Sequence, residues 1–260
     1  MRRFRLITIN TIFLLVFTHL PLLGQSIYFN DFENYSDPLT EWSLHGSVPS
    51  DWTLNEPILS PTPGTEQHPS DRFLGQFSGN DSTSLTLNNL PPHSTITISF
   101  DLYIIRSWDG STPQTYGIDV WDMNVAGGPT LLHTSFSNWF GDFAPQAYPD
   151  TYPDGNNPGF TGAAEIDTLG FFCSYKEVNG VQDSVYRFYG EQAFTFSHSA
   201  ESLVINFSGD GLQSHRVHPS NPENVWDESW GLDNVLVTPE PATLFLLGLG
   251  SLALLRKRRA

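Results

Sequence analysis

The chain has 260 residues, of which 39% are hydrophobic and 15% are charged, a composition that fits one globular domain with accessory segments. The formal net charge is −16, but residues 27–238 alone contain five bases and 27 acids, a net charge of −22. A body this acidic repels phosphate backbones, which argues against nucleic acid as a partner. It is compatible with cations and with neutral ligands such as sugars, or simply with a solvated acidic surface.

Residues 1–26 have the three parts of a secretory signal peptide. Three arginines in the first five residues precede an apolar run from Leu6 to Phe17, and Gly24 and Ser26 stand three and one residues before a plausible cleavage point. The pattern predicts export, with an uncleaved membrane anchor as the alternative. The single cysteine, Cys173, allows no intrachain disulfide, so the exported body must be stabilised by its core or by a bound metal.

Residues 27–238 are predicted to form an all-β domain. In the stretch STITISFDLYII, residues 94–105, apolar side chains alternate with mostly polar ones, which is the period of a strand. Similar short runs are separated by clusters of Gly, Pro, Asn and Asp: SIYFNDF, RFLGQFS, SLTLNNL, YGIDVWD, TLLHTSF, VYRFYGEQAFTF, SLVINFS and WGLDNVLV. Together they predict an antiparallel β-sandwich that is jelly-roll-like.

A long segment, residues 138–167, interrupts this rhythm of short strands. It is rich in Pro, Gly and aromatic residues, and loops of this length inside a compact domain are often functional. The alternative is a loop that packs its aromatic side chains against the edge of a sheet.

The first and last predicted strands carry acids that are candidate metal ligands: Asp31, Glu33 and Asp233. Terminal strands of a jelly roll commonly lie close together, and carboxylates supply the hard oxygen ligands that Ca²⁺ prefers. The pattern resembles carbohydrate-binding and lamin-G-like jelly-roll modules, a resemblance that implies one structural Ca²⁺. Solvated acids at turns are the alternative.

Tryptophan and acid gather at two other predicted strand ends. The set is Trp108, Asp109, Trp226, Asp227, Glu228 and Trp230. In many sugar sites an aromatic ring stacks on the sugar while acids accept hydroxyl hydrogen bonds, so this set is a candidate glycan-binding site. Core tryptophans beside turn acids are the alternative. If Asp109, Asp227 and Glu228 converged, glycoside hydrolysis would be a further alternative.

The C-terminus, TPEPATLFLLGLGSLALLRKRRA, has three ordered parts. Pro239, Glu240 and Pro241 come first. Fourteen uncharged residues, 242–255, follow and predict a transmembrane helix of about 21 Å, short for a bilayer core of roughly 30 Å. The chain then closes on a basic group that predicts a cytoplasmic C-terminus: Arg256, Lys257, Arg258 and Arg259.

These three parts resemble the PEP-CTERM sorting signal of exported bacterial proteins, which is typical of exopolysaccharide and biofilm producers. The resemblance covers residues 239–260 and implies that an exosortase recognises Pro-Glu-Pro and removes the tail. It implies transient anchoring in the inner membrane but no activity for the body. We therefore expect a non-enzymatic module of the cell envelope or extracellular matrix that contacts polysaccharide. A polysaccharide-degrading or modifying enzyme and a purely structural surface protein are the alternatives.

Overall fold

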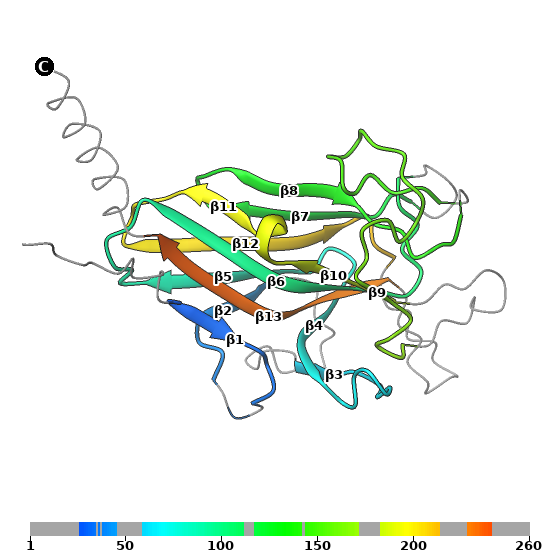
Figure 1. The fold of residues 1–260 in the computed structure, drawn as a ribbon, viewed down its shortest axis with the longest axis horizontal. Coiled ribbons are helices and arrows are strands. Elements are labelled where there is room, and N and C mark those ends of the chain that lie inside the picture. The colour runs from blue at the N-terminus through cyan, green and yellow to red at the C-terminus, as the bar shows by residue number, and fades with distance from the viewer. Residues whose placement is uncertain are drawn as a thin grey trace, which may run out of the picture.

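The computed structural model describes the body of the chain in several ranges: residues 26–34, 36, 38–45, 59–111, 117–141, 144–171, 183–213 and 228–240. These residues form two antiparallel sheets that face one another (Figure 1). The predicted all-β, jelly-roll-like sandwich is therefore confirmed. The predicted signal peptide, apart from Ser26, and the predicted transmembrane helix lie outside the described residues. Within the described residues, no helix is long and apolar enough to cross a membrane.

The larger sheet has eight strands. Its path runs β3 (Leu59–Pro61), β4 (Arg72–Ser78), β13 (Ser229–Glu240), β6 (Thr95–Ile105), β10 (Asp183–Phe188) and β9 (Glu165–Ile166). Two further strands join it, β1 (Tyr28–Asn30) on β13 and β11 (Phe194–Ser197) on β6.

The smaller sheet has five strands. Their order is β2 (Trp42–His45), β5 (Ser82–Asn88), β12 (Ser202–Asp210), β7 (Val120–Val125) and β8 (Thr130–Ser135). Each predicted strand has a counterpart in one of the two sheets, although a 3₁₀ turn, η1 (Gly190–Gln192), divides the predicted run 185–196 into β10 and β11. The short strands β2, β3 and β9 were not predicted.

Aromatic side chains from both sheets fill the space between them. Phe100 of β6 lies 5.9 Å, centroid to centroid, from both Trp121 of β7 and Phe207 of β12. Trp121 also meets Trp230 of β13 edge to face, with the ring centroids 5.7 Å apart. Pairs in this geometry stabilise the fold beyond the apolar area that they bury, so these rings hold the two sheets together.

More of the outer face of the larger sheet is buried than the alternation of apolar and polar residues predicts. Alternation in β6 places Ile96, Ile98, Phe100, Leu102 and Ile104 in the core, as predicted. The opposite side of the strand was expected to face solvent, yet Tyr103 and Asp101 on that side are also buried. A second apolar cluster covers this side, in which Leu169 and Phe171 from the segment after β9 are buried together with Tyr103. The Phe73 ring lies between them, 5.2 Å from Tyr103 and 6.0 Å from Phe171, centroid to centroid.

The long segment 138–167 packs its aromatic side chains against the sandwich, apart from Asp142 and Phe143, which lie outside the described residues. The Tyr148 ring lies 5.2 Å from Phe136 and 5.3 Å from Tyr186, centroid to centroid. Buried Gln146 anchors the segment, since its amide donates to the carbonyl of Thr161 at 2.9 Å and its Oε1 accepts from the Tyr186 hydroxyl at 3.2 Å. The aromatic residues of the described part therefore serve packing in large measure.

The last strand continues into the predicted sorting signal. Pro239 and Glu240 belong to β13, where they pair with Ile96 and Thr95 of β6. The other neighbour of this part of β13 is β1, whose register ends at Val237. Proline lacks a backbone N–H, so it is tolerated in a strand where one side of the ladder is open.

Two core tryptophans allow a test of how much the indole hydrogen bond of Trp108 contributes to stability. Trp108 Nε1 donates to the carbonyl of Ser229 at 2.8 Å, whereas Trp121 Nε1 has no hydrogen-bond partner in the described part of the chain. Trp→Phe removes the same atoms at both positions, but only at Trp108 does it leave a buried carbonyl without its donor. Trp108→Phe should therefore lower the unfolding free energy by about 1–2 kcal/mol more than Trp121→Phe. Urea unfolding of both variants measures the difference, and equal losses would contradict it.

Candidate functional site

The two described tryptophans of the predicted glycan site are core residues. Trp108 and Trp230 are both 0% exposed, and the Trp230 ring packs 4.4 Å from that of Phe77. A sugar cannot stack on a ring that solvent cannot reach, so the prediction of these two residues as binding platforms is wrong. Trp226 and Asp227 lie outside the described residues.

The predicted acids Asp109 and Glu228, by contrast, come together at one end of the sandwich. Asp119, which the sequence analysis missed, joins them, and one carboxylate oxygen from each of the three lies within 4.8 Å of the others. Asp119 and Glu228 are 0% exposed, and Asp109 is half-buried. We call these three residues the acidic triad.

Strand topology explains why the acidic triad forms. Antiparallel pairing of β6 with β13 puts the last residue of β6 beside the first residue of β13, at one end of the larger sheet. In the smaller sheet, pairing of β7 with β12 likewise puts the start of β7 beside the end of β12. Asp109 follows β6, Asp119 precedes β7 and Glu228 precedes β13. The position of Asp119 directly before a predicted strand was a usable signal, but nothing in the sequence showed which strand ends meet.

Hydrogen bonds fix one oxygen of each buried acid of the triad. The backbone N–H of Asp109 donates to Asp119 Oδ2, and the backbone N–H of Gln213 donates to Glu228 Oε2. The Gln213 side chain reaches toward Asp109 Oδ2 at 3.5 Å. Complete burial of Glu228 keeps a polymeric substrate away from it, so the triad in this arrangement does not support the alternative of glycoside hydrolysis.

The three acids predicted as metal ligands are engaged separately. Asp31 and Glu33 follow β1 and are exposed; Asp31 Oδ1 accepts the Glu33 N–H at 3.3 Å, and Glu33 Oε1 accepts the Arg72 N–H at 2.8 Å. Asp233 is buried, and its Oδ2 accepts the Tyr103 hydroxyl at 2.8 Å. Among the described residues the acids that converge as ligands are those of the triad, so the structure does not assemble the predicted set.

Asp233 belongs instead to a polar network on the outer face of the larger sheet. It pairs directly with Asp101 across β13 and β6, an arrangement in which two ionised carboxylates repel one another. Asn234 relieves this repulsion, because its Nδ2 lies 3.0 Å from Asp101 Oδ2 and 3.2 Å from Asp233 Oδ2. Burial, partly offset by the Tyr103 hydrogen bond, raises the pKa of Asp233 to about 7, and burial also raises the pKa of Asp101.

The network continues along β10 to a histidine. Arg187, whose side chain is half exposed, forms ion pairs with Asp101 and Glu165. His68 bridges Glu165 and Asp71, each at 2.9 Å. Burial lowers the pKa of His68, but the hydrogen bonds to these two carboxylates outweigh it and raise the pKa overall.

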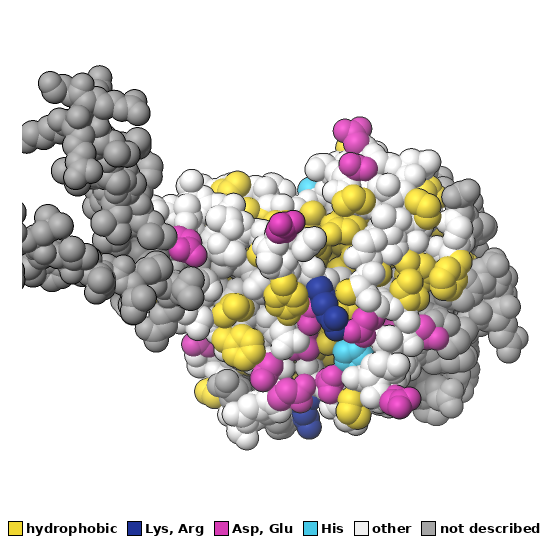
Figure 2. Space-filling view, viewed as in Figure 1, with side chains coloured by type: hydrophobic (Ala, Val, Ile, Leu, Met, Phe, Trp, Pro, Cys, Tyr) yellow, Lys and Arg dark blue, Asp and Glu magenta, His cyan; other side chains and the backbone are white. Residues whose placement is uncertain are grey.

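Figure 2 shows this outer face as a continuous surface. A basic side chain lies beside a histidine and several acids, and hydrophobic side chains lie next to them. One exposed hydrophobic residue is placed there by register: Phe29 of β1 is opposite Leu236 of β13, which is opposite Ser99 of β6. Ser99 is two residues from Asp101 on the same side of β6, so Phe29 lies on the same face of the sheet as the network, one residue pair along the strands. The Phe29 side chain is 57% exposed.

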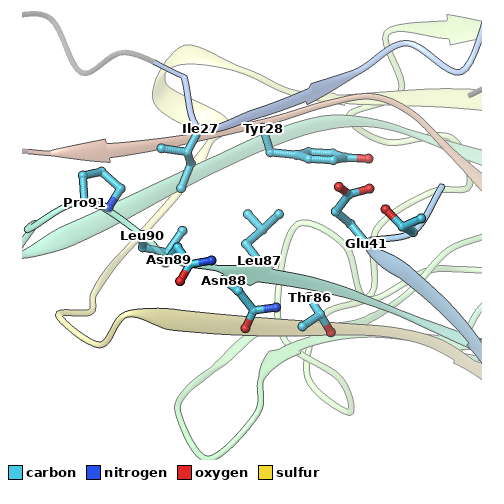
Figure 3. Close-up of a pocket in the computed structure, with 10 residues that line it drawn as sticks. Ile27, Tyr28, Glu41, Thr86, Leu87, Asn88, Asn89, Leu90 and Pro91 are labelled. Atoms are coloured by element: carbon cyan, nitrogen blue, oxygen red, sulfur yellow. The ribbon is translucent and has the colours of Figure 1, made fainter. Parts of the chain in front are cut away.

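The other side of β1 borders a cavity of about 440 Å³ (Figure 3). Tyr28 and Glu41 line it together with Leu87 and Asn88 of β5. The Tyr28 hydroxyl accepts a hydrogen bond from Trp42 Nε1 at 2.6 Å, which fixes the ring beside the cavity. Alternation along β1 thus places Tyr28 at the cavity and Phe29 on the outer face.

The raised pKa of Asp233 leads to a prediction about how the free energy of unfolding depends on pH. Its pKa in the unfolded chain is near 4 and in the folded protein about 7, so the folded state holds the extra proton between these values. The stability that Asp233 contributes is therefore fully present below about pH 4 and declines as the pH rises to about 7. Between pH 5 and pH 8 the loss is on the order of 2 kcal/mol. Asp233→Asn should remove this part of the decline, whereas Asp31→Asn, at an exposed position, should not. Urea unfolding at both pH values measures the slopes, and equal slopes for the two variants would contradict the assignment.

Comparison with known proteins gives a match to a sorting-motif family and weak likenesses to solved structures, two of which are described below. Residues 237–259 match the PEP-CTERM protein-sorting motif. No curated protein matches the chain. The CBM22-1 xylan-binding domain of Paenibacillus barcinonensis Xyn10C is 11% identical with a TM-score of 0.36, over 84% of this chain and 97% of that domain.

The Agl-KA catalytic domain is 12% identical with a TM-score of 0.30, over 77% of this chain and 26% of the other. Values this low carry no argument about ligand or activity. The sorting motif does carry one, because it implies export, transient membrane anchoring and processing by an exosortase. The chain is thus an exported β-sandwich that carries a PEP-CTERM sorting motif at residues 237–259.

Proposed function

We propose that the body is a non-enzymatic module of the cell envelope or extracellular matrix, and that it contacts polysaccharide with the outer face of its larger sheet. The observation that supports this most is that the exposed Phe29 lies on the same face of the sheet as the Asp101–Arg187 network, close to it along the strands. An exposed ring can stack on the apolar face of a sugar, while the Arg187 guanidinium and the Glu165 carboxylate, whose side chains are 47% and 20% exposed, can exchange hydrogen bonds with its hydroxyls. A sheet face also presents an open, elongated surface that suits a polymer.

The charge of the body narrows the class of polysaccharide. Residues 27–238 carry a net charge of −22, which repels strongly anionic polymers at low salt. Neutral or amino-sugar-containing chains fit better. Among the described residues, Arg187 is the cation of this network. Its charge is already balanced by ion pairs with Asp101 and Glu165.

Two exposed phenylalanines permit a matched test of the proposed face. Phe29→Ala should weaken retention on the host's own exopolysaccharide about tenfold, since loss of one stacking ring removes roughly 1 kcal/mol or more. Phe140→Ala makes the same change in the long segment, at a side chain 52% exposed, and should leave retention unaltered. Affinity electrophoresis in gels that contain the polysaccharide measures both.

Other outcomes favour other functions. Equal retention of the two variants would mean that a different surface binds. Release of reducing sugars from the polysaccharide would favour the degrading or modifying enzyme, and absence of both binding and release would favour a purely structural surface protein.

The sorting motif leads to a prediction about the mature protein. We propose that residues 242–255 span the inner membrane before processing and that the basic group from Arg256 to Arg259 stays in the cytoplasm. In the native host the mature chain should then lack the residues after about position 241. Intact mass spectrometry of protein from the envelope or medium measures this, and recovery of a chain that ends at Ala260 would refute processing.

A further inference from the structure

We propose that the cavity beside β1 is a binding site for a single sugar residue that carries a protonated amine. The volume of the cavity, about 440 Å³, lies in the lower part of the range of small-molecule sites, roughly 300–1,000 Å³. The cavity lies between β1 of the larger sheet and β5 of the smaller sheet (Figure 3). It is separate from the outer face, and its occupation does not depend on polysaccharide contact there.

The middle of the cavity is apolar. Ile27 points into it from the side of β1 and Leu87 points into it from β5, with the Tyr28 ring alongside (Figure 3). Leu87 is buried in the main hydrophobic core, and Ile27 and Tyr28 are half-buried and pack against that core. A pyranose ring presents the C–H bonds of one face to such a surface, and an aromatic ring strengthens the contact. The middle of the cavity therefore suits a sugar ring.

Polar side chains lie at the two ends of the cavity. Glu41 lies at one end, and Asn89 lies with Pro91 at the other (Figure 3). Within the part of the chain that the structure describes, no hydrogen bond or ion pair joins the side chain of Glu41 or Asn89 to another residue. Both groups can therefore form hydrogen bonds with a ligand without breaking bonds within the protein.

The backbone around the cavity is held in place independently of a ligand. The Thr86 N–H donates to the carbonyl of Glu41 at 2.7 Å, which fixes the segment that carries the acid. At the opposite end, the Leu90 N–H donates to the carbonyl of Glu201 at 3.0 Å, which fixes the segment that follows β5. Walls that are already ordered lose little conformational entropy when a ligand binds.

The charge of the lining selects the kind of sugar. Of the ten residues that line the cavity, all of them described, Glu41 is an acid and none is a base. The carboxylate of an acidic sugar would meet the like charge of Glu41 with no base to offset it, whereas a protonated amine forms a charge-assisted hydrogen bond with Glu41. The net charge of −22 on residues 27–238 also attracts cations over a longer range. An amino sugar therefore fits the cavity better than a neutral or an acidic sugar.

The first experiment is an NMR titration of the purified exported protein with free glucosamine at about pH 6, where the amine is protonated. A ligand of this size should bind with a dissociation constant on the order of 1 mM. Glucose, which has the ring without the amine, and ethanolamine, which has an amine without the ring, should each bind about fivefold more weakly. Glucuronate should bind more weakly still. Absence of glucosamine binding, or binding of any of the other three as tight as that of glucosamine, would overturn the proposal.

The second experiment locates the site with two variants of the same charge change. Glu41→Gln keeps the shape of the side chain and removes its charge, so it should lower the affinity for glucosamine about fivefold and leave that for glucose unchanged. Glu191→Gln, at an exposed position in η1 outside the lining of the cavity, should bind both sugars as the parent protein does. Unaltered glucosamine affinity in both variants, or an equal loss in both, would overturn the assignment.

Loss of affinity in Glu41→Gln can be separated from loss of fold. The Glu41 side chain bonds to no other described residue, so the variant should melt at the same temperature as the parent protein. The titration also uses a free small molecule, whereas the outer face is tested with a polymer. Loss of polysaccharide retention in Phe29→Ala and loss of glucosamine binding in Glu41→Gln are therefore independent results, and the two proposals fail separately.

Discussion

Pairing between β6 and β13 joins two parts of the chain that are more than a hundred residues apart, and the placement of the charged groups depends on it. Its register sets Asp233 opposite Asp101 and Trp230 opposite Ile104. It also places the end of β6 beside the start of β13, at the end of the sheet where Asp109 and Glu228 come together. A slip of one residue would turn every side chain of β13 to the other face and separate both groups of acids.

The two groups of buried acids illustrate different ways in which an acidic exported domain handles close carboxylates. On the outer face, Asn234 donates to both aspartates and burial favours a proton on Asp233. At the end of the sandwich, backbone N–H groups donate to one oxygen of Asp119 and to one oxygen of Glu228. The first arrangement makes stability depend on pH, because Asp233 binds its proton more tightly in the folded protein.

Local patterns in the sequence were sufficient for the fold class, because alternation of apolar residues and clusters of turn residues determine strands directly. They were insufficient for the role of the tryptophans. Trp108 stands after a strand and beside an acid, as a sugar-stacking residue does, and only the three-dimensional packing shows that its ring enters the core. Asp109 and Glu228 were predicted as members of one candidate glycan-binding site, but Asp119 was not, because contact between strand ends of different sheets depends on topology rather than on local pattern. The same reason explains why Asp31 and Glu33 do not join Asp233 as ligands.

The end of β13 has a consequence for the order of events during export. Pro239 and Glu240 pair with β6, and the carbonyl of Glu240 accepts a hydrogen bond from the Ser94 N–H at 3.2 Å. A peptidase that binds this segment as an extended peptide must compete with β6 for the same backbone groups. Folding of the sandwich and capture of the motif are then kinetic rivals. Opening of the two terminal residue pairs of β13 would then have to precede cleavage of a folded body.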